Sequence, residues 1–122
     1  MLQTWLKNFA EESCLADCYY YISRNGNIRK DDFLKWLSIG IERGDILDDG
    51  YVKNANNIMK GLVYISKVNN TDRPQIARFY NPRTGYSHFV IAKPDGEVIW
   101  DPLTDSITVK EGFIKDWRIV EQ

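Results

Sequence analysis

Apolar residues in the first half of the chain recur with the spacing of helices. The clearest stripe follows the i, i+3, i+4, i+7 pattern of an amphipathic helix and consists of Leu15, Cys18, Tyr19 and Ile22. Ser13, which precedes the stripe, is a residue type favoured at helix N-termini, and Asn25-Gly26 is a typical helix end. These signals predict a helix over residues 13–24.

Three further helices are predicted from the same kind of pattern. A short apolar stripe near the N-terminus is made by Leu2, Trp5, Leu6 and Phe9. Residues 30–43 predict a helix with Asp31 and Asp32 at its start, where acidic side chains suit the helix dipole. Residues 52–60 predict a shorter helix after the turn at Asp48-Asp49-Gly50.

After Gly61 the pattern changes to short runs rich in β-branched and aromatic residues. These runs predict strands at residues 62–66, 76–80, 87–93 and 97–100, near 106–109, and at 116–120. Pro94-Asp95-Gly96 predicts a tight hairpin between the third and fourth strands. Because helices come first and strands later, we expect an α+β domain with an antiparallel sheet.

Length and composition restrict the class of protein. A chain of 122 residues, 43% hydrophobic and 27% charged, is expected to form one globular domain over residues 1–122. The net charge is −1 and no basic stripe is present, which argues against nucleic-acid binding. We find no apolar run long enough for a membrane span and no secretory signal, so a cytoplasmic location is expected.

The single histidine of the chain, His88, opens the strand that leads into the predicted hairpin. If Asp95-Gly96 are the two turn residues, Pro94 faces Glu97 and Asp101 faces Val90. Asp101 then shares a face with His88 and lies near enough to accept a hydrogen bond from the imidazole. A register slip of one residue would separate them, and His88 as an ordinary half-buried strand residue is the simpler alternative.

Two cysteines lie on the predicted helix over residues 13–24. Cys14 falls at the helix N-terminus, where the dipole and free N–H groups favour a thiolate. Cys18 falls in the apolar stripe, as a buried cysteine often does. The alternative is a later helix start, with Asp17 as the N-cap and Cys18 as the nucleophile. Two cysteines and one histidine do not match the spacing of a zinc site.

The order of these residues resembles a known family. Cys14-Leu15, Gly50-Tyr51-Val52, Ser87-His88-Phe89-Val90 and Asp101-Pro102-Leu103 are similar to the papain-like cysteine peptidases. Within that superfamily the chain looks closest to small stand-alone bacterial and phage relatives of the bacteriocin-leader (double-glycine) peptidases. The resemblance implies a papain-like fold with N-terminal helices packed on a C-terminal antiparallel sheet.

The resemblance also implies roles for individual residues. Cys14 is expected to be the nucleophile, His88 the general base and Asp101 the carboxylate that orients it, with no metal or organic cofactor. The family places a glutamine upstream of the nucleophile to help form the oxyanion hole, and the corresponding residue here is Asn8. Asn8 is shorter but is also an amide donor. A glycine that often follows the nucleophile is replaced by Leu15.

Two functions of different classes follow from the sequence. The first is a cysteine peptidase that acts on a peptide or protein substrate through a thioester, with a related acyl transfer as a variant of the same chemistry. The second is a papain-like protein that no longer catalyses and binds a protein partner instead. The second hypothesis is motivated by the missing glutamine and by an aromatic content of 13%.

Overall fold

The computed structural model describes residues 13–48, 50–103 and 106–121. Its helices are α2 (Cys14–Ser23), α3 (Lys30–Glu42), α4 (Ala55–Met59) and α5 (Ile107–Glu111). Its strands are β1 (Leu62–Ser66), β2 (Gln75–Asn81), β3 (Tyr86–Ala92), β4 (Val98–Trp100) and β5 (Phe113–Glu121). The α+β class expected from the sequence is therefore confirmed.

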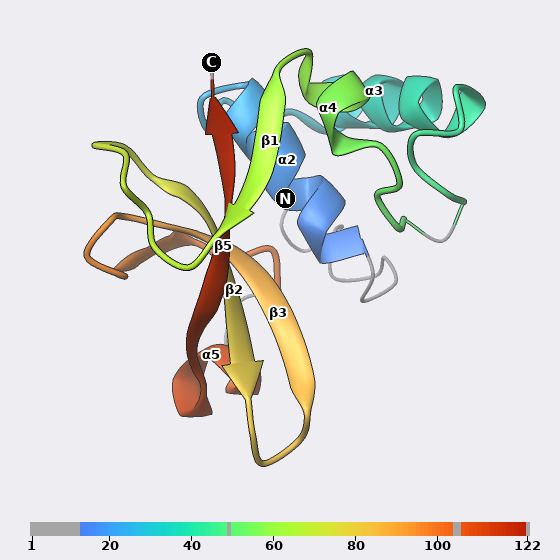
Figure 1. Ribbon diagram of the computed structural model, residues 1–122. Helices are drawn as coiled ribbons and strands as arrows, with labels where there is room; N and C mark the ends of the chain where they lie inside the picture. Colours follow the sequence, from blue (N-terminus) through green and yellow to red (C-terminus); the bar gives the residue numbers. More distant parts are fainter. Residues whose placement is uncertain (1–12, 49, 104–105, 122) are drawn as a thin grey trace.

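The strands form one five-stranded antiparallel sheet in the order β1-β5-β2-β3-β4. Strand β5 lies between β1 and β2 and pairs with both, so it joins β1 to the rest of the sheet. Figure 1 shows α2, α3 and α4 gathered beside one part of the sheet, with α5 at its other end.

The predicted helices are confirmed in the described part of the chain, with small differences at their ends. The helix predicted at 52–60 begins later, at Ala55. Ser13 stands at the predicted N-cap position of α2, but its φ and ψ angles are helical and its side chain makes no capping hydrogen bond. The N-terminal stripe of Leu2, Trp5, Leu6 and Phe9 lies outside the described residues.

The strand predicted near residues 106–109 is wrong, because Ile107–Glu111 is a helix. Its β-branched residues favour a strand by propensity, but the backbone N–H groups of Val109 and Lys110 both donate to the Ser106 carbonyl in a helical turn. Val109 then packs against a buried cluster of the sheet. Tertiary packing overrides local propensity in this short segment.

The two faces of the sheet contribute to different parts of the core. One face packs against Cys18 and Tyr19 of α2 through Ile76, Ile91 and Val120. The other face forms a cluster of alternating residues from β2, β3 and β5, namely Ala77, Phe79, Val90, Ala92, Trp117 and Ile119. A third cluster joins α2 to α3 through Tyr20, Phe33, Leu37 and Ile46. Helix α2 is thus held on both sides.

None of the helices within residues 13–48, 50–103 and 106–121 is both long enough and apolar enough to cross a bilayer.

Candidate active site around Cys14

Cys14 is the first residue of α2, where the N–H groups of the first turn have no partner within the helix. Gly50 lies against this turn with a φ of +93°, and a Cβ atom there would come within 2.8 Å of the Ser13 Cβ and 3.0 Å of the Ser13 Cα. A side chain at position 50 would displace the turn that carries Cys14. The close approach explains why glycine is suited to this position.

His88 and Asp101 are joined across the β3–β4 hairpin. The His88 Nε2–H donates to Asp101 Oδ1 at 2.6 Å, and the Leu103 backbone N–H donates to the same oxygen at 2.8 Å. Both partners are largely shielded from solvent, with 5% of the His88 side chain and 14% of the Asp101 side chain exposed. The bond engages Nε2, which leaves Nδ1 as the second polar atom of the ring.

The β3–β4 hairpin has the predicted strand pairing at Trp100, but its loop is longer than predicted. The Lys93 N–H donates to the Glu97 carbonyl, so the loop contains Pro94, Asp95 and Gly96 and not the two residues predicted. Ala92 consequently pairs with Val98, one step out of the predicted register. A β-bulge before Trp100 corrects the step, because Trp100 pairs with Ile91 as predicted. Asp101 directly follows Trp100, and its carboxylate accepts the hydrogen bond from His88.

The neighbours of His88 determine its charge. Burial of the ring acts to lower the pKa of His88, but hydrogen bonds to Asp101 and Cys14 and the charges of both residues raise it to about 9. Cys14 therefore lies within interaction range of the ring that Asp101 holds. The structure brings the three residues Cys14, His88 and Asp101 together from α2, β3 and the end of β4.

Cys18 has a different environment one turn further along α2. It is fully buried in the cluster with Tyr19, Ile76, Ile91 and Val120. Burial raises the pKa of the Cys18 thiol well above its usual range, and the nearby charges of Cys14, Asp17 and Asp101 raise it further. Cys18 is held as a neutral thiol, which is the form that neither attacks carbonyls nor binds metals.

Asp17 is the residue at this site that the sequence reasoning missed. It is 2% exposed, and its Oδ1 is the only buried side-chain polar atom among the described residues that lacks a hydrogen-bond partner. Burial raises the pKa of the Asp17 carboxyl to about 8, against a smaller opposite effect of His88. The sequence signal for it is an acidic residue between two cysteines on a predicted amphipathic helix, a position at which the sequence suggests only an N-cap for Asp17.

Cys14 lines a cavity of about 520 Å³, which we call the Cys14 cavity. Its walls are mainly apolar or aromatic, and Lys53 and Arg118 add positive charge. The other lining residues come from α2, the segment before α4, the start of α4, β1 and β3, and are Leu15, Tyr19, Tyr51, Val52, Ala55, Val63, Tyr64, Ile65, Ser87 and Phe89. A cavity of this size is large enough to hold the side-chain atoms of several residues.

The remaining candidate, Asn8, lies outside the described residues. Comparison of the chain with protein-family models, curated proteins and solved structures found no match.

Proposed function

We propose that this protein is a cysteine hydrolase of the papain-like kind that cleaves a peptide or protein substrate. The observation that carries the proposal is the 2.6 Å hydrogen bond between His88 and Asp101 next to Cys14 at the wall of a cavity. A nucleophile, a base and a group that orients the base are the parts that acyl transfer requires.

The chemistry assigns one role to each residue. Asp101 holds His88 through Nε2, so Nδ1 takes the proton of the Cys14 thiol. The thiolate attacks the substrate carbonyl carbon, and His88 returns the proton to the leaving amine as the C–N bond breaks. Water, deprotonated by His88, then hydrolyses the thioester and releases the carboxylic acid with the free thiol.

The position of Cys14 at the N-terminus of α2 supports both the thiolate and the tetrahedral intermediate. The positive end of the helix dipole stabilises negative charge on sulfur. Backbone N–H groups of the first turn are suitable donors to an oxyanion. The side-chain amide of Asn8 is a further donor by resemblance to the family.

The walls of the Cys14 cavity indicate the kind of substrate. Apolar and aromatic side chains such as Val52, Tyr64 and Phe89 favour an apolar substrate side chain near the scissile bond. Arg118 donates to Asp116 at 2.8 Å and lies over the Phe89 ring, which fixes its position at the wall.

The experiment that tests the proposal compares the two cysteines of α2. The wild type, Cys14→Ala and Cys18→Ala proteins are incubated with a thiol-directed active-site probe and with a peptide library. We expect Cys14→Ala to abolish labelling and cleavage, with a loss on the order of a thousandfold or more, and Cys18→Ala to retain both. Equal inactivity of the wild type and Cys14→Ala proteins would refute the proposal.

A partner-binding protein without catalysis is the second candidate. Two apolar side chains that line the Cys14 cavity are largely exposed, Tyr51 at 55% and Ile65 at 64%. Exposed aromatic and aliphatic side chains of this kind are suited to an interface. This function predicts that Cys14→Ala leaves partner binding intact, while Ile65→Glu weakens it.

A further inference from the structure

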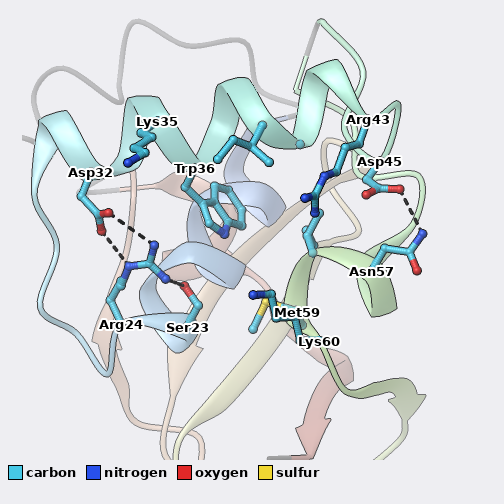
Figure 2. A pocket seen from close by; sticks show the side chains of 13 residues that line it. Ser23, Arg24, Asp32, Lys35, Trp36, Arg43, Asp45, Asn57, Met59 and Lys60 are labelled. Carbon is cyan, nitrogen blue, oxygen red and sulfur yellow. Dashed lines mark hydrogen bonds and ion pairs between the residues drawn. The ribbon is translucent and has the colours of Figure 1, made fainter.

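A second cavity lies away from Cys14, between the end of α2, α3 and α4 (Figure 2). Its volume is about 460 Å³, and it shares no lining residue with the Cys14 cavity. Trp36 of α3 is partly buried on its wall, and we call it the Trp36 cavity.

The cationic side chains of this cavity outnumber its carboxylates. Arg24 donates to Asp32 at 2.6 Å in a fixed ion pair. Lys35, Arg43 and Lys60 also line the cavity, and within the described part of the chain their side chains form no ion pair or hydrogen bond. Figure 2 shows Arg24, Arg43 and Lys60 arranged around the ring of Trp36.

The carboxylates of the cavity already have partners. Asp32 accepts hydrogen bonds from Arg24 and Tyr20, and these bonds lower the pKa of Asp32 to about 2. Asp45 accepts from the side-chain amides of Asn54 and Asn57, both at 3.1 Å. The groups left to bind a ligand are therefore mainly donors and positive charges.

We propose that the Trp36 cavity binds a small phosphate-bearing molecule, with its phosphate groups held by Lys35, Arg43 and Lys60. A phosphate carries close to two negative charges and several acceptor oxygens, so it gains from several converging cations at once, whereas a single carboxylate is satisfied by one. The volume exceeds that of phosphate alone and leaves room for an organic part against Trp36. The proposal is independent of the chemistry at Cys14.

The backbone conformation of Lys60 allows the proposed anion site to be tested with a single substitution. Lys60 ends α4 with a φ of +53°, in the left-handed region that favours glycine. Lys60→Gly relieves this strain and also removes a cation. We expect the variant to melt at a higher temperature than the wild type and yet to bind the anion about tenfold more weakly. A purely structural role of Lys60 predicts no change in affinity.

The experiment is a titration of the full chain with inorganic pyrophosphate, followed by NMR at the indole N–H of Trp36. The resonance is assigned with Trp36→Phe, and Lys67→Gln serves as the charge-matched control because Lys67 is exposed outside the cavity. We expect a saturable shift with a Kd below about 1 mM, weakened by Lys60→Gly and Arg43→Gln and unchanged by Lys67→Gln. Absence of saturation, or equal weakening by Lys67→Gln, would overturn the proposal.

Discussion

The charge of His88 depends on two neighbours from different elements, Asp101 after β4 and Cys14 at the start of α2. Hydrogen bonds to both residues raise the pKa of the largely buried His88 imidazole above that of an exposed one, although burial alone would lower this pKa. The chain has one histidine, so its titration is observed without overlap from others.

Replacement of Asp101 by asparagine tests this coupling directly. Asparagine keeps the shape and an acceptor for the Leu103 N–H, but loses the negative charge that favours the imidazolium. We expect the pKa of His88, about 9 in the wild type, to fall by about one unit or more in Asp101→Asn. The measurement is an NMR titration of the imidazole resonances, and identical titration curves would contradict the assignment.

The sequence predicted that Cys14, His88 and Asp101 lie close together, but it did not predict what surrounds them. Cys14, His88 and Asp101 were each marked by local signals, namely a helix start, a strand start and a hairpin exit. Asp17 was missed because burial depends on what packs around α2, which no local pattern reveals. The burial of Cys18 in the core and the contact of Cys14 with His88 likewise depend on tertiary packing.

At the scale of elements, the turn that presents Cys14 depends on Gly50. Gly50→Ala should force the backbone at Ser13 to move and slow alkylation of Cys14 by about tenfold or more, as small displacements do at reacting groups. Gly85→Ala is the matched control, because Gly85 also has a positive φ, +77°, but nothing lies within 4 Å of its added Cβ.

Both variants should lose about 1 kcal/mol of stability or more from backbone strain. Only Gly50→Ala should also change the reactivity of Cys14, which is measured by mass spectrometry after timed alkylation. Equal reactivity in the two variants would show that Gly50 does not position the nucleophile.

The elements themselves were mostly predictable, and the failures have physical causes. Helices 13–24 and 30–43, predicted from their periodicity, and the strand at 62–66, predicted from its β-branched and aromatic run, agree with α2, α3 and β1. The hairpin differs in two details that compensate, a longer loop and a bulge before Trp100. Neither detail leaves a clear sequence signal, since the same residues Pro94-Asp95-Gly96 suit loops of either length.

For the whole molecule, the raised pKa values of Asp17 and His88 predict how stability depends on pH. Asp17 has a pKa of about 8 in the folded protein against an ordinary value of 3.8, so folding becomes less favourable as pH rises between these values. His88, with a pKa of about 9 against 6.5, stabilises the fold fully below pH 6.5, and this contribution is lost as pH rises through 9.

We therefore expect the free energy of unfolding in urea to fall from about pH 4 to pH 9. Asp17→Asn should reduce the decline between about pH 4 and pH 8. At pH 8 the variant should be more stable than the wild type by more than about 1 kcal/mol, because the cost of ionising a buried carboxyl is removed. A steeper decline in Asp17→Asn than in the wild type would contradict the burial of this carboxyl.

The measurement that tests the central claim most directly is the alkylation rate of each cysteine as a function of pH, in the wild type and in His88→Ala. An activated pair predicts that Cys14 reacts much faster than Cys18 at neutral pH, and that His88→Ala removes this advantage. Slow reaction at both cysteines, unaffected by His88→Ala, would contradict a Cys14–His88 site and favour a protein that binds a partner without catalysis.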